Sequence, residues 1–284
     1  MFQPYLHAVL ALSALYPERE ARAVARGLME DGFGVSLTDI YSGKVREFSA
    51  SQRADYDRML ARLLDGEPLQ YVTGTALFGP LRLHVDRGVL IPRPETEELA
   101  AWAAEEAAAT ARILDAGTGS GCIALYMKHA CPGADVSACD LSPEALAIAR
   151  DNALRLGLTV SFFRADMLGG EMLEGAPLDI IISNPPYIAE SEKAGMERNV
   201  LHYEPPEALF VSDSDPLVFY RALARIAAAR LAAGGRLYVE VNSRFAAGTA
   251  DTFRSAGLTG ITIRRDMEGR ERMIRAQKAD NKTL

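Results

Sequence analysis

From residue 112 onward the chain alternates between short apolar runs and helical patterns, and this alternation limits the folds open to it. A regular exchange of strand and helix predicts a parallel sheet covered by helices on both faces. The runs of strand length are residues 112–115, 135–140, 159–163, 178–183 and 236–241. Two more, near 258–265 and 271–276, follow each other with no helix between them. We therefore expect an α/β sheet with an antiparallel C-terminal edge strand.

The chain before this region has a different pattern. Up to residue 71, apolar side chains recur at the spacing of helices, as in Ala21, Val24, Ala25, Leu28 and Met29. Residues 72–92 alternate apolar and polar side chains, with glycine at the bends, which predicts a short β-hairpin. We expect a small helical N-terminal domain over 1–71, a hairpin linker over 72–92 and the α/β domain over 93–284.

Charge and cysteine content limit the classes of function. With a net charge of −7, the chain is a poor candidate for direct binding of nucleic acid, because phosphate contacts favour basic proteins. Cys122, Cys131 and Cys139 form no CxxC pair, which argues against a zinc site or a disulfide framework. The N-terminus lacks the pattern of a signal peptide, and no apolar run approaches the roughly 18 residues of a membrane span. We expect a cytoplasmic protein with no membrane contact.

A glycine-rich turn follows the first strand of the alternating region. Ligands of open α/β sheets bind beyond the carboxyl ends of the strands, and Gly117, Gly119 and Gly121 fall there. The dinucleotide fingerprint G-x-G-x-x-G would need a glycine at position 122, which is Cys122, so a nicotinamide dehydrogenase is the weakest alternative. The observed G-x-G-x-G is typical of S-adenosylmethionine-dependent methyltransferases. The alternative is a tight turn with a purely structural role.

Acidic residues follow the next two strands. Asp140 ends the second strand, where a carboxylate can accept hydrogen bonds from both hydroxyls of a ribose. Asp166 and Met167 follow the third strand, where we expect the acid to accept from the adenine amine and the methionine to pack near the ring. The alternatives are a helix-capping role for Asp140 and an ordinary loop position for Asp166.

Asn184-Pro185-Pro186-Tyr187 follows the apolar run at 178–183. The nitrogen of an amide or a base amine is a poor nucleophile, so an enzyme that methylates it must hold both N–H bonds with acceptors. The side-chain oxygen of Asn184 and the carbonyl of Pro185 can be these acceptors, and the prolines stiffen the loop. We expect Asn184, Pro185 and Tyr187 to be catalytic, with Tyr187 stacking on a planar group and all four residues binding the substrate. The alternative is a proline-rich turn.

Longer segments surround these motifs. They are Pro68–Gly74, Leu90–Glu97, Gly117–Gly121, Ser183–Ile188 and Tyr203–Phe210. In these segments the chain resembles the HemK/PrmC family, the protein-glutamine N-methyltransferases that modify class I peptide chain release factors. The Leu90–Glu97 segment is the most restrictive of them. The chain departs from the family at Ala116 and Asn242, where glycine is usual.

The resemblance implies a cofactor, a substrate and a set of contacts. S-adenosylmethionine is the implied methyl donor and S-adenosylhomocysteine the product, with no metal. Asn184 through Tyr187 are implied to hold the glutamine of the release factor's Gly-Gly-Gln motif, while the helical domain grips the release factor. The implied cofactor contacts are Gly117, Thr118, Gly119, Ser120, Gly121, Asp140, Met167 and Asn184.

Two other functions remain open on the residues alone. An adenine or guanine amine fits the same acceptors, so a nucleic-acid amino-methyltransferase is the first alternative; the acidic charge disfavours it. A non-catalytic S-adenosylmethionine-binding module is the second, although such a module needs no acceptors at Asn184 and Pro185. We expect a monomer whose four histidines lie at the surface or in the core and bind no metal.

Overall fold

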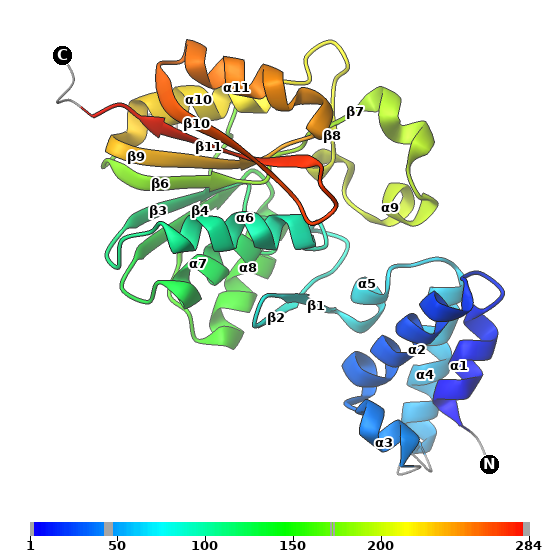
Figure 1. Ribbon diagram of the computed structural model, residues 1–284. Helices are drawn as coiled ribbons and strands as arrows, with labels where there is room; N and C mark the ends of the chain where they lie inside the picture. Colours follow the sequence, from blue (N-terminus) through cyan, green and yellow to red (C-terminus); the bar gives the residue numbers. More distant parts are fainter. Residues whose placement is uncertain (1–2, 43–47, 171, 173, 281–284) are drawn as a thin grey trace. The chain divides into compact units, whose positions relative to one another are not determined.

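The computed structural model describes residues 3–42, 48–170, 172 and 174–280. The chain divides into two compact units. The helical unit contains the chain up to Thr75 together with Glu197–Tyr203, and the α/β unit contains Ala76–Met196 and the chain from Glu204 onward. Figure 1 follows the chain from the blue helices at the N-terminus to the red strands at the C-terminus.

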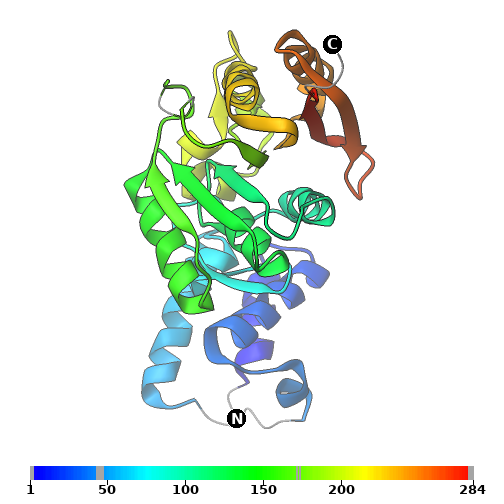
Figure 2. The ribbon, with the colours of Figure 1, turned by 90° about the vertical axis from the view of Figure 1, so that its left-hand side faces the viewer.

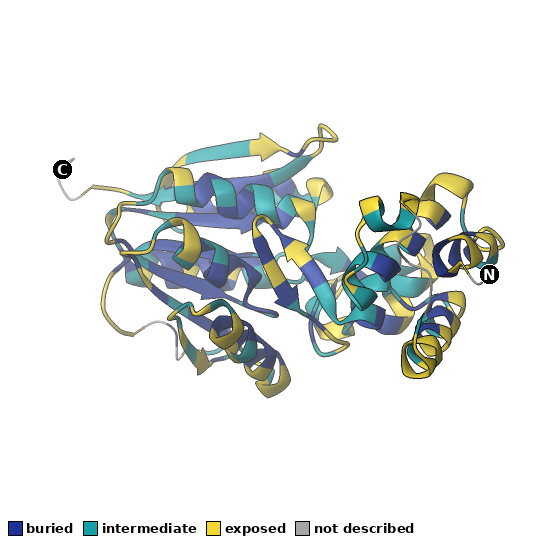
Figure 3. Cartoon of the chain, turned by 90° about the horizontal axis from the view of Figure 1, so that it is seen from below, coloured by how far each residue is buried: buried dark blue, intermediate teal, exposed yellow. Residues whose placement is uncertain are grey.

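The helical unit has its own apolar core. Its helices are α1 (Pro4–Leu12), α2 (Glu18–Phe33), α3 (Leu37–Tyr41), α4 (Ala50–Leu64), α5 (Leu69–Thr73) and α9 (Arg198–Tyr203). The apolar positions seen in the sequence meet in this core, where Ala21, Leu28 and Met29 of α2 pack with Leu60 and Leu63 of α4. In Figure 3 these helices carry exposed residues on their outer sides. The prediction of a helical N-terminal region is confirmed.

A two-stranded hairpin follows α5, with strands β1 (Thr75–Phe78) and β2 (Leu81–His84). The strand expected at Val72 and Thr73 is wrong, because both residues lie in α5. Gly74 ends that helix with a φ of 69°, a conformation that glycine adopts without strain, so the extended chain begins one residue later. The run Val89–Ile91 also forms no strand.

Seven strands of the described chain form the main sheet, in the order β10-β11-β9-β6-β3-β4-β5. They are β3 (Arg112–Ala116), β4 (Asp135–Asp140), β5 (Ser161–Arg164), β6 (Leu178–Ser183), β9 (Leu231–Glu240), β10 (Leu258–Arg265) and β11 (Glu271–Lys278). The antiparallel strand expected at the edge lies one place further in: β11 runs antiparallel to both β9 and β10. A short loop joins β10 to β11, so the two form a hairpin, and β10 takes the edge.

Helices cover both faces of this sheet. One face carries α6 (Pro94–Glu105), α7 (Cys122–Ala130) and α8 (Pro143–Leu156), and the other α10 (Val218–Arg230) and α11 (Ala246–Ser255). Side chains of β6 alternate between the two layers: Ile180 and Ile182 pack with α6 and α7, and Ile181 with α10. Figure 2 shows the strands between the helices after a turn of 90°.

Several element ends follow the sequence signals. The side chain of Ser142 accepts from the amide of Ala145 and caps α8, which ends at Gly157 in the left-handed conformation. The helix expected to open at Asp215 begins later, at Val218, after a turn. The remaining short elements are β7 (Ile188–Ala189), β8 (Phe210–Val211) and the 3-10 turns Glu190–Gly195, Pro206–Ala208 and Ser243–Phe245.

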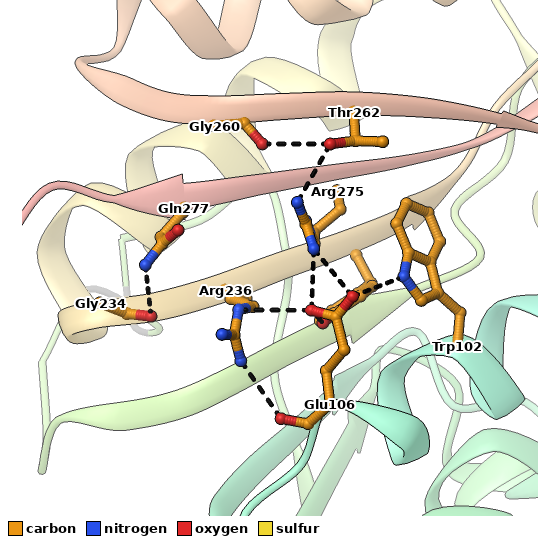
Figure 4. A network of polar contacts seen from close by, with 9 residues as sticks. Trp102, Glu106, Gly234, Arg236, Gly260, Thr262, Arg275 and Gln277 are labelled. Atoms are coloured by element: carbon orange, nitrogen blue, oxygen red, sulfur yellow. Dashed lines mark hydrogen bonds and ion pairs between the residues drawn. The ribbon is translucent and has the colours of Figure 1, made fainter.

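A polar cluster fastens the C-terminal end of α6 to the sheet (Figure 4). The carboxylate of Glu106 accepts from the indole of Trp102 at 2.8 Å, from the hydroxyl of Tyr238 at 2.8 Å and from Arg275 at 2.8 and 2.9 Å. Tyr238 belongs to β9 and Arg275 to β11, so one carboxylate ties the helix to two strands. Thr96 lies at the opposite end of α6, in its first turn.

Candidate active site

The glycine-rich turn after β3 folds across the end of β4. The amides of Gly117 and Thr118 both donate to the carbonyl of Cys139, at 2.9 Å each. Gly119 has a φ of 54°, and a Cβ built on it would meet no atom within 4 Å. Gly121 has a φ of 84°, and its Cβ would lie 3.1 Å from a side chain of α8. Glycine at 121 therefore permits close packing of α8, while glycine at 119 leaves open space beside the turn.

Asp115 braces this turn from inside the protein. It is fully buried, and its Oδ2 accepts from the hydroxyl of Thr118 at 2.6 Å and from the amide of Ala124 at 3.1 Å. Its Oδ1 has no hydrogen-bond partner. Burial raises the pKa of Asp115 to about 7. No role was predicted for Asp115, although an acid at the end of the apolar run 112–115 was a visible signal.

Asp140 lies where β4 ends and contacts the turn directly. Its Oδ2 accepts from the amide of Gly119 at 2.9 Å, and its Oδ1 accepts from the amide of Ser142 at 3.0 Å. Each carboxylate oxygen can accept more than one hydrogen bond, so both retain capacity for a ligand. Asp140 is not the N-cap of α8, because the side chain of Ser142 caps that helix.

Asp166 and Met167 follow β5, as expected. The Oδ1 of Asp166 accepts from the amide of Leu168 at 2.8 Å, which shapes the loop. Met167 is buried, and its terminal methyl group lies 3.4 Å from a Cβ built on Gly117. The loop after β5 and the turn after β3 thus pack against each other.

Asn184 takes part in a chain of hydrogen bonds that was not predicted from the sequence. Its Nδ2 donates to the hydroxyl oxygen of Thr96 at 2.9 Å, and this hydroxyl donates to Oε2 of Glu240 at 2.6 Å. The hydroxyl of Tyr187 donates to Oε1 of the same carboxylate at 2.8 Å. Burial raises the pKa of Glu240. The hydrogen bonds from Thr96 and Tyr187 and the nearby charge of Arg272 lower it, but by less.

Of the remaining residues of the Asn184–Tyr187 segment, one lines a cavity and another packs against the apolar core on the α10 side. Pro185 is buried, and Pro186 faces the cavity described below. The ring of Tyr187 packs against the core on the α10 side, and its hydroxyl is bonded to Glu240. Burial raises the pKa of Tyr187 well above its usual value. The structure thus gives Tyr187 an anchoring contact that the stacking hypothesis did not include.

An ion pair joins two of the segments that carry the family resemblance. Nη2 of Arg93 lies 2.6 Å from Oε1 of Glu204, whose side chain is 1% exposed. The other carboxylate oxygen accepts from the amide of Ile91 at 3.4 Å. The segments Leu90–Glu97 and Tyr203–Phe210 are therefore held together at Glu204.

These elements enclose a cavity of about 530 Å³ in the α/β unit. Of the residues predicted from the sequence, Gly117, Thr118, Gly119, Ser120, Asp140, Asp166, Met167, Asn184 and Pro186 line it. Gly121, Pro185 and Tyr187 do not. The lining residues that had no predicted role include Pro92, Arg93, Thr96, Cys122, Cys139, Pro205, Glu207 and Phe219.

The cavity suits a nucleoside. Its volume lies within the roughly 300–1,000 Å³ of small-molecule sites. The open space beside Gly119, the Asp140 carboxylate and the apolar surface of Met167 offer room, acceptors and a packing face for a ribose and a base. Burial raises the pKa of both lining thiols, Cys122 and Cys139, to about 12, so neither is a thiolate nucleophile. The residues present fit S-adenosylmethionine.

In residues 3–42, 48–170, 172 and 174–280, no group of three or more His, Cys, Asp and Glu side chains could hold a metal ion. Over the same residues, no helix has both the length and the apolar character needed to cross a membrane.

Two family models match the chain. The PrmC N-terminal domain matches residues 6–74, and the Methyltransferase small domain matches residues 99–203. The first match covers the helical N-terminal region. The second covers the glycine-rich turn, Asp140, Asp166 and the Asn184–Tyr187 segment.

Curated relatives match almost the whole chain. The release factor glutamine methyltransferase of Bacteroides thetaiotaomicron is 41% identical over 94% of this chain and 96% of its own. The protein of the same name from Deinococcus radiodurans is 40% identical over 90% of each chain. Among solved structures, a methyltransferase from Pyrococcus furiosus aligns with a TM-score of 0.54 at 19% identity, over 78% of this chain and 99% of its own. This last similarity bears on the fold, and the predicted class I methyltransferase fold is confirmed.

Proposed function

Because the chain belongs to the release factor glutamine methyltransferase family, the family that the sequence resemblance indicated, we propose that it methylates the side-chain amide nitrogen of a release factor glutamine. The methyl donor is S-adenosylmethionine, and the target is the glutamine of the Gly-Gly-Gln motif of class I peptide chain release factors. The single observation that carries the proposal is the position of Asn184. Its side chain lies at the wall of the cavity that the glycine-rich turn and Asp140 also line.

The acceptor side of the reaction depends on Asn184 and Pro185. Since the Nδ2 of Asn184 is used by Thr96, its Oδ1 is left to accept one N–H of the substrate amide. The carbonyl of Pro185 accepts the other. Holding both N–H bonds orients the nitrogen lone pair, and the buried loop provides this orientation before the substrate arrives. Substrate contact by Pro186 and Tyr187 completes the proposed binding segment.

The cofactor side depends on the ends of β3, β4 and β5. S-adenosylmethionine, when bound, supplies an electrophilic methyl group on a positively charged sulfur. We assign the ribose hydroxyls to Asp140, the adenine amine to Asp166 and one face of the adenine ring to Met167. The backbone of Gly117–Gly121, including Thr118 and Ser120, borders the remainder of the cofactor, and S-adenosylhomocysteine leaves from the same place.

The cellular setting of the protein is part of the proposal. The acidic chain and the absence of a spanning helix in its described part support a protein that acts on another protein in the cytoplasm. We further propose that it works as a monomer, requires no metal, and contacts neither membrane nor nucleic acid directly.

The test is methyl transfer from labelled S-adenosylmethionine to a purified class I release factor. Duplex DNA and ribosomal RNA serve as parallel substrates, and a release factor with Glu in place of the Gly-Gly-Gln glutamine is the matched control. Label on that glutamine, located by mass spectrometry and absent from the control, is the expected result. Label on nucleic acid alone would overturn the proposed substrate.

A further inference from the structure

Thr96 and Glu240 lie beside the proposed acceptor without belonging to it. Thr96 comes from the first turn of α6, and Glu240 is the last residue of β9. Both are buried, at 2% and 1% exposure. They connect to Asn184 in series, through a bond of 2.9 Å from Asn184 to Thr96 and one of 2.6 Å from Thr96 to Glu240. No other side chain bonds to Nδ2 of Asn184 among the interactions of the described residues.

The chemistry of the three groups gives this series a direction. An ionised carboxylate only accepts hydrogen bonds, so the hydroxyl of Thr96 must donate its single proton to Glu240. The oxygen of Thr96 can then only accept from its other neighbour. Asn184 must present its NH2 group to Thr96, because its carbonyl oxygen would face another acceptor.

Burial raises the pKa of Glu240, and three neighbouring groups oppose this effect by stabilising the ionised carboxylate. Each carboxylate oxygen receives a hydroxyl donor, one from Thr96 and one from Tyr187. The Arg272 guanidinium adds a favourable charge. The main-chain carbonyl of Glu240 accepts from the hydroxyl of Tyr220 at 3.1 Å, which holds the end of the strand in place.

We propose that Glu240 and Thr96 are positioning residues that set the orientation of the Asn184 amide and so direct its Oδ1 to the substrate amide. This inference rests on the proposed function, since it needs Asn184 to be the acceptor. The inference adds to the proposed function the groups that select one orientation of the Asn184 amide, with Oδ1 toward the substrate, over the flipped orientation, with the NH2 group toward the substrate. A side-chain amide has nearly the same shape in both orientations, so packing alone does not choose between them.

Glu240→Gln provides the sharpest test because it reverses the series while keeping the shape. The glutamine NH2 can donate to Thr96, whose hydroxyl then donates to Oδ1 of Asn184, and the Asn184 NH2 turns to the substrate. Thr96→Val removes the middle hydroxyl, and Thr96→Ser restores it. We expect kcat for release factor methylation to fall by about 10-fold to 100-fold in Glu240→Gln and Thr96→Val, with most of it recovered in Thr96→Ser.

Controls separate positioning from stability. Glu106→Gln is the control, because Glu106 is also a carboxylate that joins one end of α6 to the sheet. It lies at the opposite end of α6 from Thr96 and does not line the cavity. The substitution should lower the melting temperature and leave kcat within about 2-fold of the wild type. Affinity for S-adenosylhomocysteine, measured by calorimetry, should stay within about 3-fold in all four variants. If Glu240→Gln and Thr96→Val lose stability but keep their kcat, the network is structural only and the proposal is wrong.

A measurement without substrate keeps this inference separate from the proposed function. In nitrogen-15-labelled protein, the side-chain NH2 signal of Asn184, identified by its loss in Asn184→Asp, should exchange slowly with water in the wild type. Exchange should accelerate by about 10-fold or more in Glu240→Gln and Thr96→Val. Unchanged exchange would refute the orientation. Failure of the wild type to methylate a release factor would refute the proposed substrate and leave this comparison intact.

Discussion

The Oδ2 atom of Asp140 lies 2.9 Å from the backbone nitrogen of Gly119. The carboxylate that ends β4 is therefore hydrogen-bonded to the turn that follows β3. The parts of the proposed cofactor site at the ends of β3 and β4 are therefore joined by a hydrogen bond, and a change at Asp140 should also affect the glycine-rich turn.

Asp140→Ala should weaken the binding of S-adenosylhomocysteine by about 10-fold to 100-fold, because it removes both proposed ribose acceptors and the bond to Gly119. Calorimetric titration measures the affinity. Asp135→Ala is the matched control, since Asp135 is an exposed acid at the other end of the same strand. Equal affinity in the two variants would contradict the assignment of Asp140.

Gly119→Ala should mainly weaken the binding of S-adenosylhomocysteine, whereas Gly121→Ala should mainly lower stability. Both positions have positive φ, so each methyl group brings a backbone cost of about 1 kcal/mol. At Gly121 the new Cβ also lies 3.1 Å from Ala149, and this crowding should add about 1–3 kcal/mol of lost stability. At Gly119 the methyl group enters open space, so S-adenosylhomocysteine affinity should suffer more than stability. Urea unfolding and calorimetry distinguish the two patterns, and a larger stability loss at Gly119 would contradict the packing argument.

Arg93→Met should destabilise the α/β unit by about 3–5 kcal/mol, because it leaves the buried carboxylate of Glu204 without its charge partner. The double variant Arg93→Met with Glu204→Gln should recover part of this loss. Urea unfolding of the single and double variants gives the coupling energy. Arg155→Met, which breaks an exposed pair with Asp151, should cost no more than about 1 kcal/mol. Additive effects at Arg93 and Glu204 would show that the pair does not act together.

Asp115→Asn should change how stability depends on pH. The pKa of Asp115 is raised from 3.8 to about 7 by burial, so the folded protein holds a proton that the unfolded chain releases between these values. The free energy of unfolding therefore falls as the pH rises through this window, by at most about 4 kcal/mol from this group. The asparagine variant lacks this contribution, so its free energy of unfolding should rise relative to that of the wild type as the pH rises. Urea unfolding from about pH 5 to about pH 8 measures it, with Asp135→Asn as the control. A constant difference between variant and wild type would refute the raised pKa.

The sequence predicted the parts of the site that depend on strand order. Asp140 ends one strand, and Gly117, Asp166 and Asn184 follow three others. Parallel strands bring their carboxyl ends to one edge of the sheet. Their meeting at one cavity is a consequence of that geometry, and it needed no knowledge of side-chain contacts. The roles assigned to them stay predictions.

The contacts between distant side chains were not predictable in this way. Thr96 and Glu240 are 144 positions apart, and their pairing depends on how α6 lies across β9. Arg93 and Glu204 stood within the segments that carried the family resemblance, yet nothing local marks them as partners. The end of α5 at Gly74 was misjudged for a different reason: Val72 and Thr73 are β-branched, and tertiary packing overrode that preference.

The order of strands in the main sheet also bears on how this protein behaves at high concentration. Open sheet edges invite pairing with a second chain, and the described strands end at β5 on one side and β10 on the other. β5 has only four residues and ends in an arginine. β10 is interrupted by register shifts near Thr259 and Arg264, and it ends in two arginines. The inward place of β11 leaves the irregular, charged strand outermost, and this arrangement protects the sheet against aggregation by strand addition.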